Sequence, residues 1–253
     1  MGNINHLLIT ICIGLEGVRN GQITKGETFS TTWNPKDVKA SADRSRIFAI
    51  KATLVWITDN IDVYFSNILK EPPFLQDQEE FETIKKLRGV YNKYRELISY
   101  FKIENRIETA FIDLAISWRN KVVHTDANND ININSRKILK ENKEFIKKNY
   151  CGLDVIDTIN SFDNNKYPSF KEITSLISSS INFVYLLDSK LIEKINMQEY
   201  IKSIVEYEKE KELKNLFIYS DLKSRNKKLE HFLEIKYGLE KEDIDLLENK
   251  YYM

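Results

Sequence analysis

Glycine and proline are scarce in this sequence of 253 residues, with eight and four occurrences. All-β architectures need many such residues in their turns, so their scarcity argues against that fold class. The two cysteines, Cys12 and Cys151, lie far apart without metal-type spacing, which indicates a reducing, intracellular setting. The sequence also lacks a glycine-rich phosphate loop and an HExxH motif. We therefore expect no bound metal and no other cofactor.

An excess of either charge is also lacking, because 38 basic residues balance 38 acidic ones. Any nucleic acid must therefore be held by a local patch. The most apolar run, residues 7–15, is too short to cross a bilayer, and no basic segment precedes it. We predict a cytoplasmic protein with no membrane partner. The spacing of the apolar residues in this run predicts a buried N-terminal helix, with Ile4, Leu7, Leu8, Ile11 and Leu15 on its inner face.

Apolar residues recur at steps of three and four through most of the remaining sequence, which is typical of amphipathic helices. Long helices are predicted over residues 47–68, 81–101, 107–122 and 170–191, and a short basic helix over 135–149. Residues 21–35 have no such period and are predicted as a loop or a short hairpin. The fold class is therefore all-α. We divide the chain into an N-terminal helix and loop (1–40), an antiparallel helical bundle (41–195) and a charged helical extension (196–253).

One stretch, FIDLAISWRNKVVHTDANND at residues 111–130, combines an apolar helix with Arg119, Asn120 and His124 and then turns polar. Positions four apart share a helix face, so Asn120 and His124 would lie side by side. Arg119 and His124 are about 140° apart around a helix with about 100° per residue. They can meet one substrate only if the helix unwinds at its end or a second chain contributes its own copy.

These residue types suit metal-independent cleavage of RNA. In that reaction the ribose 2′-hydroxyl attacks the neighbouring phosphate, which requires a base, an acid and a cation that stabilises the phosphorane. Histidine can transfer the protons near neutral pH, and arginine has a planar fork that matches phosphate oxygens. Asn120 can orient the ribose or the phosphate. If the acid and the base are both histidines, a symmetric dimer supplies the two copies of His124.

The order of Arg119, Asn120 and His124 near the end of a bundle helix resembles the signature of the HEPN superfamily, in which arginine is followed by four to six residues and histidine. The resemblance covers residues 41–195. It implies a metal-independent endoribonuclease that leaves a cyclic phosphate, forms a homodimer with a composite site and acts as a toxin or an anti-phage (abortive infection) effector. An antitoxin or defence-system protein is then an expected partner besides RNA. Members whose antitoxin modifies a tyrosine carry it two residues after the histidine, where this sequence has Asp126.

A second match to the same loose pattern occurs at Arg225, Asn226 and His231. We favour the first match because it ends a strongly apolar helix that must pack, whereas the second lies in a charged stretch with little to hold it rigid. Structural roles are the alternative for the first match. His124 can cap a helix C-terminus, and Arg119 can form a salt bridge with Asp113 or Glu108.

Two other features have a structural interpretation that we prefer. The basic stretch 136–148 can follow a phosphate backbone, but by itself it is typical of a solvated helix face. Tyr91, Tyr94 and Tyr100 can stack on bases, but their helical spacing favours the core or a dimer interface. Two further functions stay open. The chain can be a non-catalytic module of the same fold that binds a nucleotide or a protein, or an oligomerising scaffold that recruits a partner through its charged C-terminal helices.

Overall fold

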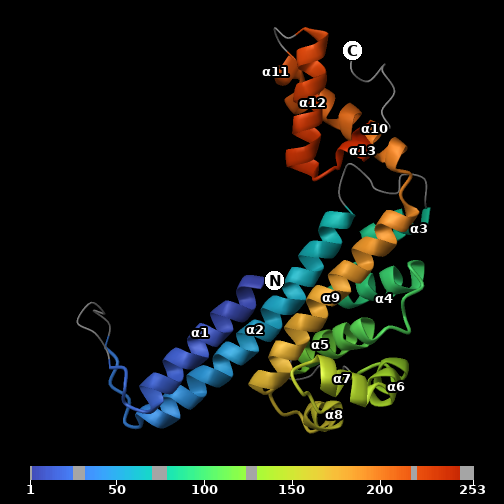
Figure 1. Cartoon of the computed structure of the whole chain (residues 1–253). Helices are drawn as coiled ribbons and strands as arrows, with labels where there is room; N and C mark the ends of the chain where they lie inside the picture. The colour runs from blue at the N-terminus through green and yellow to red at the C-terminus, as the bar shows by residue number, and fades with distance from the viewer. Residues whose placement is uncertain (1, 25–31, 70–78, 124–129, 218–220, 246–253) are drawn as a thin grey trace. The chain divides into compact units, whose positions relative to one another are not determined.

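The computed structural model describes residues 2–24, 32–69, 79–123, 130–217 and 221–245. These residues form helices joined by short connections and contain no strand, which confirms the prediction of an all-α chain (Figure 1). None of these helices combines the length and the apolar composition that a membrane span requires. The chain divides into two units, residues 1–65 with 86–187 (unit 1) and residues 66–85 with 188–253 (unit 2).

The helices of the first half of the chain are α1 (Gly2–Arg19), α2 (Val38–Ile68), α3 (Glu79–Lys86), α4 (Val90–Tyr100) and α5 (Ile107–Val123). The second half contains α6 (Ile133–Glu141), α7 (Lys143–Asn149), α8 (Val155–Asp163), α9 (Phe170–Lys194), α10 (Met197–Glu208), the π-helical turn η1 (Lys209–Leu213), α11 (Lys214–Phe217), α12 (Leu222–Tyr237) and α13 (Lys241–Ile244).

Helix α5 is the centre of unit 1. Every residue from Thr109 to Trp118 is buried, because this part of the helix is mainly apolar and carries few polar side chains, among them the buried Asp113. Aromatic rings from other helices complete the core, and the ring of Phe183 lies 6.2 Å from that of Phe65 and 6.3 Å from that of Tyr94. Tyr94 is fully buried, so its predicted core role is confirmed.

The starts of several helices follow from local sequence. Asp154 accepts hydrogen bonds from the backbone N–H groups of Ile156 and Asp157 and so caps α8. Before α9, the N–H of Ser169 donates to the Glu172 carboxylate, while the N–H of Glu172 donates to the Ser169 hydroxyl. This reciprocal capping box satisfies two N–H groups that the helix itself leaves without a partner.

The helix predictions need four corrections. The single helix expected over residues 81–101 is broken into α3 and α4 by Gly89, whose φ of 83° suits glycine. The basic helix expected over 135–149 is two helices, which meet at Asn142. Helix α8 was not predicted at all. The N-terminal helix does form, but it is only partly buried, because Leu7 and Ile11 are exposed.

Unit 2 has its own apolar core, formed by Ile201, Ile204, Val205, Leu213, Leu229, Leu233, Leu239 and Ile244. Unit 2 also contains the buried carboxylate of Glu208, which accepts hydrogen bonds from Lys236 Nζ at 2.8 Å and from the Tyr237 hydroxyl at 2.5 Å. Burial raises the pKa of Glu208, but these two hydrogen bonds outweigh it and hold the pKa below its ordinary value. The second match to the motif, Arg225 to His231, lies on α12, which contributes Leu229 and Leu233 to this core. The expectation that little holds this match in place is therefore wrong.

Candidate functional site

The last turns of α5, which carry Arg119 and Asn120, are fixed by contacts with the end of α8 and with the connection that follows it. The indole N–H of Trp118 donates to the carbonyl oxygen of Lys166 at 3.0 Å. Lys121 Nζ lies 3.5 Å from the carbonyl oxygen of Phe162 and 3.8 Å from the centre of its ring. These contacts hold the helix on both sides of Arg119, so its backbone is placed by packing rather than by the helix alone.

Arg119 itself turns toward α2. Its Nη1 lies 3.2 Å from Asn120 Oδ1, and its Nη2 lies 3.9 Å from Asp59 Oδ1. The Arg119 side chain is 25% exposed and that of Asp59 is 60% exposed. The guanidinium is therefore held at the surface by an amide and a carboxylate. A long ion pair with an exposed partner is weak, so an anion of better geometry can replace the carboxylate.

The ion-pair partners that the sequence suggested for Arg119 are wrong. Glu108 lies 3.7 Å from Arg106 instead. Asp113 is fully buried, and its Oδ2 accepts the backbone N–H of Asn132 at 2.9 Å. Asp59 was missed because it is 60 residues away from Arg119 along the chain. No pattern in the sequence names Asp59 as the partner of Arg119.

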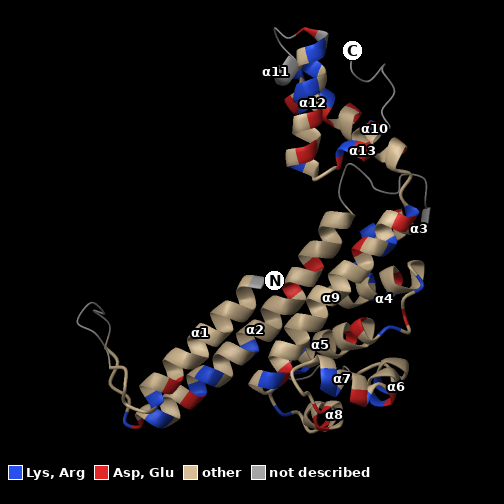
Figure 2. Ribbon diagram, viewed as in Figure 1, with Lys and Arg blue, Asp and Glu red and all other residues tan. Residues whose placement is uncertain are grey.

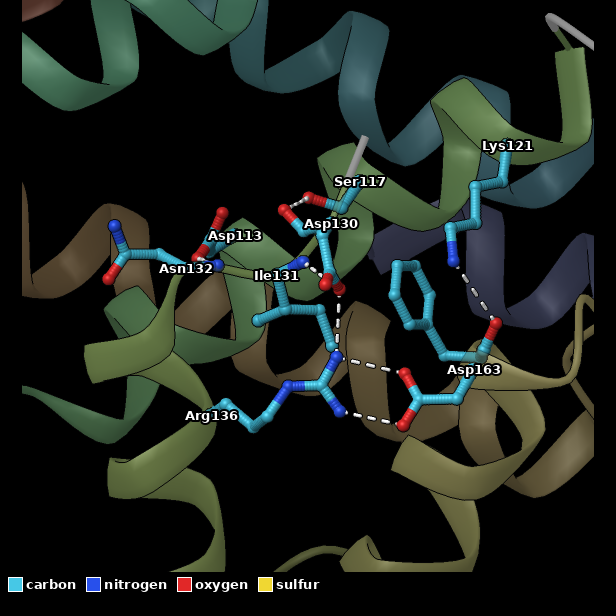
Figure 3. A network of polar contacts seen from close by, with 9 residues as sticks. Asp113, Ser117, Lys121, Asp130, Ile131, Asn132, Arg136 and Asp163 are labelled. Carbon is cyan, nitrogen blue, oxygen red and sulfur yellow. Dashed lines mark hydrogen bonds and ion pairs between the residues drawn. The ribbon is translucent and has the colours of Figure 1, made fainter. Parts of the chain in front are cut away.

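Two polar side chains of α5, those of Asp113 and Ser117, bind the backbone at residues 130–132, just before α6 (Figure 3). One helical turn after Asp113, the Ser117 hydroxyl lies 3.4 Å from the carbonyl oxygen of Asp130. Asp113 and Ser117 are four residues apart and so share one face of the helix. Burial raises the pKa of the Asp113 carboxyl, against the opposing effect of its hydrogen bonds with Ser135 and Asn132.

Arg136, in the first turn of α6, connects the segment at residue 130 to α8. Its Nη1 and Nη2 bind both carboxylate oxygens of Asp163, at 2.7 and 2.8 Å, and Nη2 also binds Asp130 Oδ1 at 2.8 Å (Figure 3). The hydrogen bond from Arg136 is the main reason that the pKa of Asp163 is lowered. Arg136 is therefore a structural clamp. The lysines that follow it, Lys137, Lys140, Lys143, Lys147 and Lys148, are exposed, as expected for a solvated face.

Two of the residues that carry the sequence argument, His124 and Asp126, lie outside the described residues. Of the predicted site, the structure therefore brings together Arg119 and Asn120. In the second match to the pattern, Arg225 and Asn226 are half-buried on α12, and His231 is exposed. At six positions apart and about 100° per residue, Arg225 and His231 lie about 120° apart around that helix.

No family model, no curated protein and no solved structure matches this chain in the comparisons made with each. Within the part of the chain that the structure describes, no group of three or more histidine, cysteine, aspartate or glutamate side chains could hold a metal ion. Among the described residues, the predicted site consists of the Arg119 guanidinium and the adjacent Asn120 amide.

Proposed function

We propose that this chain is a metal-independent endoribonuclease that cleaves RNA by attack of the 2′-hydroxyl and leaves a cyclic phosphate. The observation that carries the proposal is the contact between Arg119 and Asn120 at the end of the most buried helix of unit 1. A cation and an amide held together at a rigid surface position suit a phosphodiester and its neighbouring ribose. The HEPN-like order of Arg119, Asn120 and His124 adds the proton-transferring group.

In this mechanism a phosphodiester takes the place of the Asp59 carboxylate beside Arg119. Both groups present two oxygens in a plane that the guanidinium fork can bind, and the phosphate gains additional stabilisation as negative charge develops in the phosphorane. His124 removes the proton from the 2′-hydroxyl or gives a proton to the leaving 5′-oxygen, and the other of these two transfers falls to the histidine of a second copy of the chain. Asn120 orients the substrate. A growth-arresting toxin or a defence effector in the cytoplasm is the role that such an activity fits.

The test is cleavage of total cellular RNA by the purified chain in EDTA, with analysis of the fragment ends. Wild type is expected to leave cyclic-phosphate and 5′-hydroxyl ends. Arg119→Ala and His124→Ala should each lower the rate by about 10²-fold or more, as loss of one transition-state group does. Arg119→Lys keeps the charge but lacks the fork, so an intermediate rate is expected.

The second match to the motif provides the control, because Arg225→Ala with His231→Ala should leave the rate unchanged. Cleavage that needs a divalent ion, or that persists in His124→Ala, would contradict the proposal. RNA that stays intact in every sample but binds to wild type more tightly than to Arg119→Ala would instead favour the non-catalytic binding module.

A further inference from the structure

An apolar stripe is exposed along α1 and α2, and we define it by Leu7, Ile11, Phe48 and Trp56. These side chains are 47%, 45%, 72% and 48% exposed. Between the two helices, which run side by side in Figure 1, lies a groove of about 360 Å³. Its lining is almost entirely carbon, and the hydroxyl of Thr53 at its floor donates within its own helix. Contiguous apolar surface of this kind marks an interaction site in water-soluble proteins.

Charges of opposite sign lie along the stripe on α2, with cations in the first half of the helix and carboxylates in the second half. With about 100° per residue, Arg44, Lys51, Asp59 and Asp62 all lie within about 60° of Phe48 around the helix. The two cations (the basic half) precede the middle of the helix, and the two carboxylates (the acidic half) follow it, as Figure 2 shows along α2. This face of α2 is therefore positive toward its start, where Arg44 is exposed and Lys51 is half-buried with its Nζ 3.6 Å from the centre of the Tyr167 ring. It is negative toward its end.

Such a face is complementary to a second copy of itself in the antiparallel direction. A two-fold axis across the middle of α2 places the basic half of each copy against the acidic half of the other, with the apolar stripes between them. A parallel arrangement would instead bring like charges together. The two carboxylates also meet cations of their own chain, since Asp59 is 3.9 Å from Arg119 and Asp62 is 3.0 Å from Lys93. Both keep exposed surface, 60% for Asp59 and 43% for Asp62.

Other occupants fit this surface less well. A helix pair that lies on a membrane carries lysine and arginine around its apolar face, whereas two carboxylates stand here and would repel anionic lipid headgroups. A small-molecule pocket combines an apolar lining with a few polar groups that converge on the ligand, whereas the polar side chains in this lining are two hydroxyls, Ser45 and Thr53, and that of Thr53 donates within its own helix.

We propose that two copies of this chain associate through the α1–α2 stripe, antiparallel and with the basic half of each facing the acidic half of the other. The stripe is then the surface through which the two chains of the proposed function associate. Because Asp59 belongs to both the acidic half and the Arg119 contact, the interface borders the candidate site. Its test involves no RNA, so the two failures can be told apart: a dimer that does not cleave RNA keeps the interface and removes the ribonuclease, whereas a chain that stays monomeric removes the interface and the second histidine of the mechanism.

The first test is analytical ultracentrifugation of the full chain up to about 100 µM, where interfaces with a micromolar Kd are occupied. Wild type should sediment as a dimer, and Phe48→Glu as a monomer with unchanged helical circular dichroism. The matched control is Ile235→Glu on α12, because Ile235 is 71% exposed but lies outside the stripe, so this variant should remain a dimer. A wild-type chain that sediments as a monomer throughout, or a dimer that survives Phe48→Glu, would overturn the proposal.

Charge reversal tests the antiparallel arrangement. One variant reverses the basic half (Arg44→Glu with Lys51→Glu), and the other reverses the acidic half (Asp59→Lys with Asp62→Lys). In a homodimer of either variant, like charges face one another across the interface. The Kd of that homodimer should therefore exceed the wild-type Kd by about tenfold or more. Mixed together, the two should form a heterodimer with a Kd within a few-fold of wild type. A mixture that associates no better than either variant alone would overturn the antiparallel pairing.

Discussion

The clamp formed by Arg136 allows a quantitative test of how the site end of unit 1 is held. Arg136 makes three hydrogen bonds of 2.7 to 2.8 Å to Asp163 and Asp130, and its side chain is 22% exposed. A hydrogen bond between charged groups contributes about 1.5–3 kcal/mol when buried, but exposed ion pairs contribute about 0–1 kcal/mol. Since the two carboxylates are 41% and 75% exposed, we expect about 2 kcal/mol for the whole clamp.

The assay is urea unfolding followed by tryptophan fluorescence. All three tryptophans, Trp33, Trp56 and Trp118, belong to unit 1, so their emission follows the unit that contains the clamp. Arg136→Met keeps an apolar stem of similar length but loses the fork. At a slope of about 2 kcal/mol per M urea, a loss of about 2 kcal/mol lowers the midpoint by about 1 M. Arg136→Lys keeps the charge without the fork, so its urea midpoint should lie about halfway between those of wild type and Arg136→Met.

The pH dependence gives the clamp a signature of its own. The pKa of Asp163 in the folded chain is lowered from 3.8, chiefly by its hydrogen bond with Arg136. Stabilisation from a lowered carboxyl pKa is fully present above the unfolded pKa and is lost as the pH falls through the folded one. The difference between wild type and Arg136→Met should therefore shrink as the pH drops below about 4.

The control is Lys137→Met on the same helix, because Lys137 is 67% exposed and its Nζ is 3.8 Å from Glu141. Such an i,i+4 pair contributes at most about 0.5 kcal/mol. Equal midpoints for Arg136→Lys and wild type, or an equal loss for Lys137→Met, would refute the reasoning. So would a difference between wild type and Arg136→Met that does not change with pH.

Three further predictions concern buried polar groups. Burial raises the folded pKa of Asp113 above 3.8, so wild type should lose stability as the pH rises through the window above that value, and Asp113→Asn should not show this loss in urea midpoints between about pH 4 and 7. Parallel pH profiles would contradict this. Glu208→Gln removes the charge that Lys236 meets in unit 2, and a cost of about 1–2 kcal/mol should appear as about 5–30-fold faster amide hydrogen exchange in α12, with unit 1 unchanged. Unchanged exchange in α12 would refute it. Tyr94→Phe removes a buried hydrogen bond of 2.8 Å to the carbonyl oxygen of Thr109 and should lower the stability of unit 1 by about 1 kcal/mol in the fluorescence assay. No change in midpoint would show that this bond contributes nothing net.

Local sequence determined the helical character of the chain and much of its element order. Apolar spacing of three and four residues places α5 and α9 to within a few residues, because a helix that must bury one face repeats its apolar residues with the helical period. It also finds α2, except for the nine residues before Ile47, which lack that period. Where the prediction failed, a local feature competed with that period. Gly89 takes a positive φ that ends the expected helix, and α8 was hidden because the polar residues around Asp163 resemble a loop.

The candidate site divides in the same way. Sequence by itself determined that Arg119 and Asn120 lie at the end of an apolar helix, since that depends on neighbours within a few residues. Only the tertiary structure decided that Asp59 meets Arg119 and that Arg136 binds Asp163. It also decided that Leu7 and Phe48 are exposed beside a groove. Periodicity tells which face of a helix is apolar but not which helix covers it, because that depends on how all the helices pack against one another.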